Sequence, residues 1–264
     1  MSSVKPKKAL GQHFLTDMSV AQRIADTLSA DTLPAPCASY ADLPVLEVGP
    51  GTGVLTQYLI RPGRELTAVE LDSEAAAFIR GKYPDLPLIE GDFLRLPEEE
   101  IYPGRDFALI GNYPYNISSQ IFFRLLEMRE RIPVCAGMLQ REVAQRICAG
   151  PGSKTYGILS VLLQVWYDCE YLFTVDENMF YPAPKVKSGV IRLLRNGRES
   201  LPCPEKTLRD VVKTAFGQRR KTLRNSLSGI IPKESPLRQD PLLALRPEQL
   251  AVDQFIDLAC RISG

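Results

Sequence analysis

The sequence predicts an α/β fold, in which a mostly parallel sheet carries helices on both faces and a small all-helical domain follows. Short apolar runs alternate with amphipathic helical segments between Val45 and Leu139. Such alternation is typical of a parallel sheet with helices on both faces. From about residue 198 onward only helical periodicity remains, and it is interrupted by prolines. We therefore expect one domain over residues 1–197 and a second over residues 198–264.

The expected elements can be placed in chain order. After a basic N-terminal arm, Asp17 is expected to cap a helix over roughly 18–29. Further helices are expected around Leu55 and Leu59, over 73–82, over roughly 118–130 and behind the fifth strand. The five apolar runs expected to form strands are Val45–Val48, Leu66–Val69, Leu86–Ile89, Phe107–Ile110 and Val134–Leu139. Two later β-rich runs, Cys169–Val175 and Gly189–Leu194, are expected to add a hairpin at the sheet edge.

The charge of the chain is segregated, although its net charge is only +1. Residues 185–224 contain twelve Lys and Arg against three acidic residues, a net charge of +9. Residues 1–8 add three lysines and no acid. A long basic segment of this kind indicates a face that binds nucleic acid. A solvated helix surface is the alternative explanation.

The cysteine and histidine content argues against metal chemistry. The six cysteines are scattered without a Cys-x-x-Cys pair, and His13 is the single histidine. Such a chain is a poor metal binder. It shows no signal peptide and no apolar stretch long enough to span a membrane. We therefore expect a cytoplasmic protein with reduced thiols, no metal and no membrane contact.

Distinctive residues follow four of the expected strands. Gly49-x-Gly51-x-Gly53 follows the first and allows close backbone approach at a helix start, but it is not the Gly-x-Gly-x-x-Gly of dinucleotide binders. Glu70 ends the second strand, where a carboxylate can accept both ribose hydroxyls. Asp92 follows the third, where it can accept an adenine amino proton while Phe93 stacks. Each residue taken alone could instead be an ordinary turn or surface residue.

The fourth strand is followed by Asn112-Tyr-Pro-Tyr115, which suits chemistry on an exocyclic amine of a nucleobase. The Asn112 side-chain carbonyl and a backbone carbonyl at Tyr113 or Pro114 are hydrogen-bond acceptors. Tyr115 offers an aromatic plane on which a base can stack. Ligands of open α/β sheets bind beyond the carboxyl ends of the strands. Because the glycine loop lacks a phosphate-binding Lys-Ser/Thr pair, we expect a nucleoside with a small charged tail, such as S-adenosylmethionine.

The chain resembles the ribosomal RNA adenine dimethyltransferase family over nearly its whole length. The motifs that carry this resemblance are Gly11–Leu15, Glu47–Gly53, Val69–Asp72, Gly91–Asp92, Gly111–Ser118, Gln140–Ala144, Phe180–Ser188 and Phe216–Asn225. The resemblance implies a Rossmann-like class I S-adenosylmethionine-dependent methyltransferase domain over 1–197 and a helical RNA-binding domain over 198–264. The implied reaction is dimethylation of N6 of two adjacent adenosines near the 3′ end of 16S, small-subunit ribosomal RNA. The implied partner is the immature 30S subunit, and the role is in its biogenesis.

The resemblance also implies which residues form the sites. Those expected around the cofactor are His13, Leu15, Gly49, Gly51, Glu70, Asp92, Phe93 and Asn112, and those expected to be catalytic are Asn112, Pro114 and Tyr115. RNA is expected to contact Lys185, Lys187, Arg219, Arg220, Lys221 and Arg224. Two residues depart from the family pattern. His13 stands where many relatives have Asn, and Tyr113 replaces the commoner Leu, which could narrow the base pocket.

Two other functions remain open at this point. A related enzyme type methylates large-subunit ribosomal RNA and confers macrolide resistance. The Phe180–Ser188 and Phe216–Asn225 motifs favour the small subunit instead. A non-catalytic RNA-binding factor for ribosome assembly or transcription is the second alternative. The intact Asn112–Tyr115 motif argues against that loss of catalysis. For Arg219 and Arg220, a role in docking the helices is the alternative to RNA contact.

Overall fold

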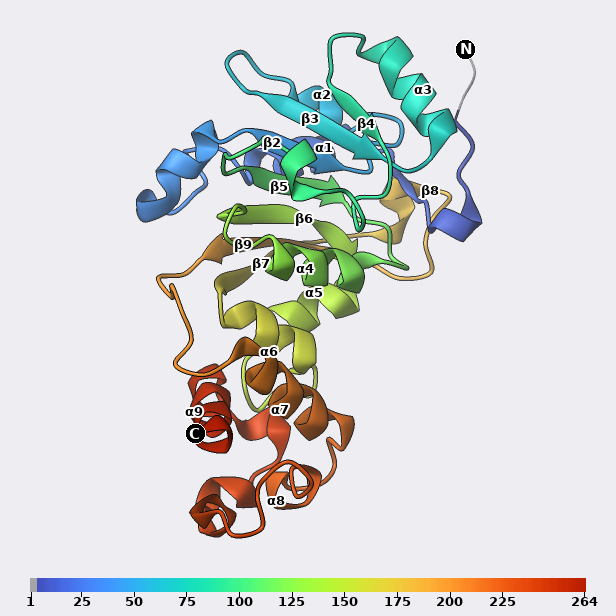
Figure 1. Cartoon of the computed structure of the whole chain (residues 1–264). Helices are drawn as coiled ribbons and strands as arrows, with labels where there is room; N and C mark the ends of the chain where they lie inside the picture. Colours follow the sequence, from blue (N-terminus) through green and yellow to red (C-terminus); the bar gives the residue numbers. More distant parts are fainter. Residues whose placement is uncertain (1–3) are drawn as a thin grey trace. The chain divides into compact units, whose positions relative to one another are not determined.

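The computed structural model describes residues 4–264, and they divide into two compact units (Figure 1). The first unit runs up to Ala144 and resumes over Glu170–Arg195, while the second comprises Gln145–Cys169 and Asn196–Gly264. The expected boundary after residue 197 falls close to the end of the first unit. However, the structure groups Gln145–Cys169 with the C-terminal helices, so the units do not follow a single cut of the chain.

The centre of the first unit is a seven-stranded sheet with the order β4-β3-β2-β5-β6-β9-β7. Its strands are β2 (Val45–Val48), β3 (Leu66–Glu70), β4 (Leu88–Glu90), β5 (Ala108–Asn112), β6 (Val134–Gln140), β7 (Tyr167–Val175) and β9 (Ser188–Arg195). The first five of these pair in parallel, as expected, and β9 runs antiparallel to β6. The two later strands extend the sheet from β6, so that β7 lies at the edge.

The register of the parallel strands brings their carboxyl ends together. Val48 of β2 lies between Val69 of β3 and Gly111 of β5. Glu70 of β3 lies opposite Glu90 of β4. The residues that follow β2, β3, β4 and β5 are therefore presented along one edge of the sheet, where open α/β sheets bind their ligands.

Helices cover the sheet because their apolar faces need a partner. The helices that follow its strands are α2 (Thr56–Leu59), α3 (Ser73–Lys82), α4 (Ser118–Glu127) and α5 (Arg141–Ile147), and α1 (Met18–Asp26) precedes the sheet. Asp17 caps α1 by accepting a hydrogen bond from the backbone N–H of Val20 at 3.0 Å, as expected. Helix α1 ends at Asp26, three residues before the expected end, and α4 likewise ends at Glu127 rather than near residue 130.

A separate two-stranded sheet ties the N-terminal arm to the segment before β9. Strand β1 (Phe14–Leu15) pairs antiparallel with β8 (Phe180–Tyr181). Phe14 lies opposite Tyr181, and Leu15 lies opposite Phe180. Leu15 and Phe180 are both buried in the core, which fixes the arm next to the sheet.

The second unit is helical, with α6 (Ile158–Gln164), α7 (Glu205–Gly217), α8 (Leu223–Ser226) and α9 (Val252–Ser263). Its core contains an aromatic row in which the ring of Phe216 lies 6.0 Å from Tyr156 and 5.7 Å from Phe255. Helix α6 belongs to this unit and packs on α7, and its residues 159–163 are buried. Within residues 4–264, no helix is both long and apolar enough to cross a membrane.

Candidate active site

A cavity lies at the carboxyl ends of β2, β3 and β5, with an empty volume of about 1160 Å³ that includes its open mouth. The cavity is open to solvent and lies where open α/β sheets bind their ligands. All the residues expected to bind the cofactor or to act in catalysis line this cavity: His13, Leu15, Gly49, Gly51, Glu70, Asp92, Phe93, Asn112, Pro114 and Tyr115. The structure thus brings together residues that are far apart in the sequence.

The glycine loop forms one wall of the cavity. Gly49, Gly51 and Gly53 have φ angles of +69°, +57° and +73°, in the left-handed region that side chains rarely adopt. A Cβ at Gly51 would lie 3.0 Å from the Phe14 ring, so this glycine lets the arm pack on the loop. A Cβ at Gly49 would meet no described protein atom within 4 Å. The open space at Gly49 is therefore where a ligand can approach the backbone closely.

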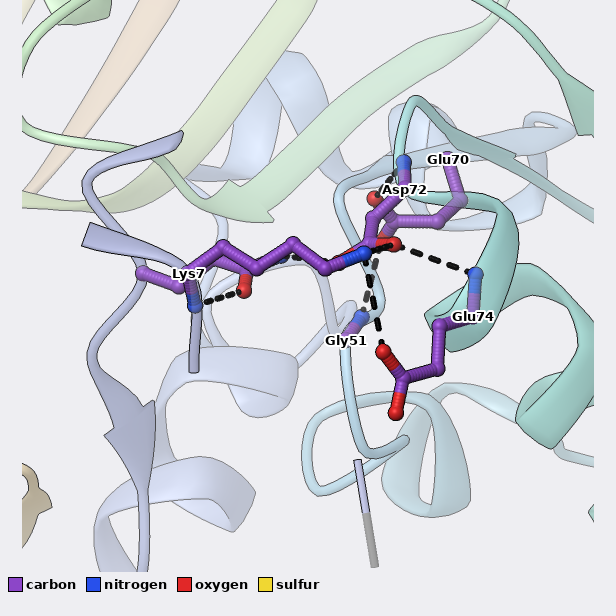
Figure 2. Close-up of polar contacts among 6 residues, drawn as sticks. Lys7, Gly51, Glu70, Asp72 and Glu74 are labelled. Carbon is purple, nitrogen blue, oxygen red and sulfur yellow. Dashed lines mark hydrogen bonds and ion pairs between the residues drawn. The ribbon is translucent and has the colours of Figure 1, made fainter. Parts of the chain in front are cut away.

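Glu70 ends β3 with its carboxylate held by the backbone, as Figure 2 shows. Its Oε2 accepts a hydrogen bond from Gly51 N at 3.0 Å, and its Oε1 accepts one from Asp72 N at 2.9 Å. Burial raises the pKa of Glu70, and these hydrogen bonds oppose the shift. Each oxygen keeps a second lone pair for a ligand, so the side chain is oriented before any ligand binds.

Glu47 is a second buried carboxyl in the wall of the cavity, and the sequence reasoning assigned it no role. It lies in the apolar strand β2 and is 1% exposed. Burial raises the pKa of Glu47 to about 8, and the nearby Glu70 adds to the shift. Its Oε2 has no hydrogen-bond partner among the described residues. The signal that could have identified it is a single acidic residue inside an apolar strand.

Asp92 and Phe93 lie on the same edge, beyond β4 (Leu88–Glu90). Asp92 Oδ1 accepts a hydrogen bond from Leu94 N at 2.9 Å, as in an ordinary Asx turn. The Oδ2 of Asp92 lies 3.7 Å from Arg95 Nε. Phe93 is 5% exposed and contributes an apolar surface to the cavity. Asp92 therefore shapes its own turn while also bordering the cavity.

The Asn112–Tyr115 segment begins at the last residue of β5. Asn112 Nδ2 donates to the backbone carbonyl of His13 at 3.2 Å. This contact orients the amide, so that its Oδ1 is the atom left to accept from a ligand. The Pro114 carbonyl accepts from Ile117 N at 3.3 Å, which occupies one of its two lone pairs.

Tyr115 is fixed on two sides. Its ring stacks on His13, with centroids 5.3 Å apart and an interplanar angle of 29°. Its hydroxyl is hydrogen-bonded to the hydroxyl of the fully buried Ser188, at the start of β9. The sequence reasoning included Ser188 in a motif but gave it no role at the site. One face of the Tyr115 ring is therefore occupied by His13, and the ring is held in place by β9.

Tyr113 and His13, the two departures from the family pattern, each make a hydrogen bond to a backbone carbonyl. Tyr113 is 1% exposed, and its hydroxyl donates to Ala136 O of β6 at 2.8 Å. A Cβ at Gly137 would lie 2.5 Å from the Tyr113 ring, so the glycine makes room for the larger side chain. His13 Nδ1 lies 2.7 Å from Pro182 O, which identifies Nδ1 as the donor. The His13 ring is thus used within the protein, through Pro182 and Tyr115.

The residues expected to bind RNA fall into two groups. Lys185, Arg220 and Lys221 are exposed. The other three make contacts within their own unit: Lys187 pairs with Asp176, Arg219 donates to Ser153 O at 3.2 Å, and Arg224, which is also exposed, donates to Arg238 O at 2.6 Å. Arg219 Nε also lies 3.9 Å from Glu248. Docking is the alternative to RNA contact for Arg219, and its observed partners, Ser153 and Glu248, both lie in the second unit.

The polar side chains that line the cavity fit S-adenosylmethionine, which carries ribose hydroxyls, an adenine amino group and a positively charged tail. Glu70 is oriented to accept from hydroxyls, and the unpartnered Glu47 oxygen adds a polar group that a ligand can hydrogen-bond. Across residues 4–264, no group of three or more His, Cys, Asp or Glu side chains is arranged to hold a metal ion.

Comparison with known proteins identifies the family. Residues 3–259 match the model of "Ribosomal RNA adenine dimethylase". The chain is 60% identical over 261 residues to "Ribosomal RNA small subunit methyltransferase A" of Porphyromonas gingivalis, with 98% of each chain covered. The structure of "23S rRNA methyltransferase ErmE" is 28% identical, with a TM-score of 0.66, and covers 95% of this chain and 100% of its own.

The fold is also that of a dimethyladenosine transferase from Plasmodium falciparum, which is 22% identical. Its structure has a TM-score of 0.75 and covers 93% of this chain and 96% of its own. These similarities extend over both compact units. The chain therefore belongs to the ribosomal RNA adenine dimethylase family and is an S-adenosylmethionine-dependent rRNA adenine methyltransferase.

Proposed function

We propose that this enzyme transfers two methyl groups to N6 of each of two adjacent adenosines near the 3′ end of small-subunit ribosomal RNA. The observation that carries the proposal is the shared cavity of Glu70, Asp92 and the Asn112–Tyr115 segment. It joins carboxylates suited to a nucleoside with acceptors suited to an exocyclic amine. The relative that is 60% identical is named as a small-subunit methyltransferase. The partner we propose is the immature 30S subunit, in whose biogenesis the enzyme takes part.

In this proposal the strand ends bind the cofactor. Glu70 accepts the ribose hydroxyls, while Asp92 accepts an adenine amino proton and Phe93 packs on the ring. Gly49 and Gly51 allow the backbone to approach, and Leu15 and His13 border the cavity from the arm. The fixed orientation of Glu70 supports its proposed role as acceptor of the ribose hydroxyls, because a prepositioned acceptor loses little conformational freedom when a ligand binds.

Catalysis in this proposal depends on positioning the adenine amine. The nitrogen lone pair is conjugated with the ring, so the amine is a poor nucleophile until it becomes pyramidal. Asn112 Oδ1 and the carbonyl of Tyr113 or Pro114 accept its two protons and favour that geometry. When bound, S-adenosylmethionine supplies an activated methyl group on a sulfonium. In-line alignment in a cavity that excludes water then provides most of the acceleration.

The target adenine must reach the cavity unpaired. Extruding a base from a helix costs a few kcal/mol, whereas stacking on an aromatic side chain returns about 1–3 kcal/mol. Tyr115 is the stacking residue we propose. Its stacking on His13 and its hydrogen bond to Ser188 support this role, because they hold the ring in one orientation.

RNA binding is proposed for the basic residues, with the second unit as the main RNA-binding part and the first as the methyltransferase part. Lys185, Arg220, Lys221 and Arg224 are exposed, and the first three are the best candidates for phosphate contacts because Arg224 also donates to Arg238 O. We also propose RNA contacts for Lys187, Arg219 and Arg224. Each of these side chains in addition makes an ion pair or a hydrogen bond within its own unit. We further propose that the protein acts in the cytoplasm, which agrees with the absence of a disulfide among the six cysteines of residues 4–264.

The alternatives are weighed by the same observations. Large-subunit methylation is represented by the ErmE structure, at 28% identity. The 60% identity to a protein named for the small subunit favours that substrate. A non-catalytic role is disfavoured by the intact cavity. The deciding experiment compares methyl incorporation into unmethylated small subunits with incorporation into large-subunit RNA. Equal or greater incorporation into the large-subunit RNA would contradict the proposal.

A further inference from the structure

The N-terminal arm is fastened to the turn between β3 and α3 (Figure 2). Lys7 Nζ forms an ion pair with Asp72 and lies 3.6 Å from Glu74 Oε2. Gln12 Nε2 donates to the other oxygen of Asp72 at 3.1 Å. Gln12 Oε1 in turn accepts from Lys7 N at 2.8 Å, which closes the arm on itself. Two side chains of one short segment therefore converge on a single carboxylate.

Asp72 is well suited to hold the arm, because its side chain is 0% exposed while that of Lys7 is 42% exposed. Burial raises the pKa of Asp72, but hydrogen bonds from Lys7 and Gln12 outweigh it and lower the pKa overall. Without the arm, this carboxylate would keep the hydrogen bond from Glu74 N but lose both side-chain partners. Hydrogen bonds to a charged group are stronger than those between neutral groups, so the contact favours a closed arm.

The same turn is part of the cofactor site. Asp72 N donates a hydrogen bond to Glu70 Oε1. The residue that holds the arm therefore also orients Glu70, the side chain proposed to bind the ribose. Between Lys7 and β1, the arm lines the cavity with Leu10, Gly11 and Gln12. The arm therefore extends along the cavity from the Asp72 turn to the β1–β8 pair.

The two ends of the arm are held differently. At the β1 end, backbone pairing with β8, the Thr16–Met179 hydrogen bonds and the buried Leu15 form a permanent attachment. At the other end residues 7–12 make polar contacts, to Asp72 from Lys7 and Gln12 and to Asn116, whose Nδ2 donates to Ala9 O at 3.4 Å. Between them lies Gly11, with a φ of +63°, which gives the segment a sharp bend. Opening the Asp72 end withdraws one buried apolar side chain, that of Val4, whereas opening the β1 end would withdraw Leu15 from the main core.

We propose that residues 7–12 form a strap over the cofactor cavity, and that the Lys7–Asp72 ion pair is the latch that must open for the cofactor to enter or leave. The strap swings from the β1–β8 pair, and closing it restores Gln12 and Lys7 to Asp72. The latch is a positioning device and takes no part in the chemistry. The inference concerns cofactor exchange alone, so it does not depend on which RNA is methylated.

A latch makes a kinetic prediction that a merely stabilising contact does not. In Lys7→Met the open strap is more populated, so S-adenosylhomocysteine should both associate and dissociate faster, each by about tenfold. Removal of a purely structural interaction would instead speed dissociation and leave association unchanged. Hydrogen exchange of the amides of residues 8–12 should also accelerate in the ligand-free variant.

The experiment measures both rates by surface plasmon resonance with S-adenosylhomocysteine and no RNA. Asp72→Asn, which keeps an oxygen to cap α3 through Glu74 N, should behave like Lys7→Met. Lys7→Arg, which keeps the charge, and Lys5→Met, which removes an exposed charge from the same arm, should both resemble the wild type. Melting curves confirm that each variant is folded.

Two results would overturn the proposal. One is an association rate in Lys7→Met that equals that of the wild type. The other is an equal acceleration in Lys5→Met, which would show a general effect of arm charge rather than a latch. Because no methyl acceptor is present, neither result bears on whether the small subunit is the substrate.

Discussion

Replacing Glu70 tests the cofactor site most closely. The carboxylate is 5% exposed and accepts hydrogen bonds from two backbone N–H groups, at 3.0 and 2.9 Å. Glu70→Ala would leave both donors without this acceptor, at a cost of about 1–3 kcal/mol for each buried group. Glu70→Gln is the better probe, because it keeps the size of the side chain and one oxygen.

The expected loss of affinity follows from the hydrogen bonds to the ribose. Hydrogen bonds to a charged group contribute about 1.5–3 kcal/mol, which is about 10- to 100-fold in Kd at 1.4 kcal/mol per factor of ten. We therefore expect Glu70→Gln to bind S-adenosylmethionine at least about tenfold more weakly, by calorimetric titration below its melting temperature. The variant should remain folded by circular dichroism, with a lower Tm.

The matched control is Glu90→Gln. Glu90 lies opposite Glu70 in the register of β3 and β4, but it pairs with Arg80 on the surface, at 2.8 Å. This control should bind the cofactor as the wild type does. If Glu70→Gln also kept wild-type affinity, Glu70 would have no place in the cofactor site, and the orientation argument would be wrong.

Four further predictions concern the residues around the cavity and the basic cluster. Asn112→Ala should greatly reduce the single-turnover rate of methylation and leave RNA affinity nearly unchanged; a near wild-type rate would exclude its role as acceptor. Tyr115→Phe should retain activity, with a Tm lowered by loss of the Ser188 hydrogen bond, whereas Tyr115→Ala should lose activity; equal activities would exclude stacking. Because the pKa of Glu47 is raised to about 8 from 4.5 in the unfolded chain, the folded protein holds a proton between these values and loses stability as the pH rises through them. Glu47→Gln should therefore gain Tm relative to the wild type as the pH rises from about 5 to about 8; a pH-independent difference would contradict this. The triple change of Arg219, Arg220 and Lys221 to Glu should weaken RNA binding, flatten the slope of log affinity against log salt by roughly 0.7–0.9 for each phosphate that is no longer neutralised, and spare cofactor affinity; a lower Tm with an unchanged slope would indicate docking instead.

The sheet and the cavity were largely predictable from the sequence, because both depend on local patterns. Apolar runs predicted the parallel strands, and the parallel arrangement itself brings their carboxyl ends together. Glu70, Asp92 and Asn112 could therefore be assigned to one site before any distance was known. The structure confirms that all three line the cavity.

What the sequence did not reveal depends on interactions between distant segments. The pairing of Lys7 with Asp72 and of Tyr115 with Ser188 joins residues that no local pattern relates. Helix α6 has the apolar character of a core helix, but its membership of the second unit follows only from its packing on α7. For the basic residues, composition showed a charged segment. Lys221 and Arg224 are both exposed, and only the structure shows that Arg224 also donates a hydrogen bond to Arg238 O.

The most direct test of the proposed function is to count methyl groups on its target. Unmethylated small subunits are incubated with the enzyme and S-adenosylmethionine, and the 3′-terminal RNA fragment is analysed by mass spectrometry. We predict four added methyl groups, two on N6 of each of two adjacent adenosines, and far fewer with Asn112→Ala over the same reaction time. Methylation of large-subunit RNA in preference to this fragment, or wild-type methylation by Asn112→Ala, would contradict the proposed function.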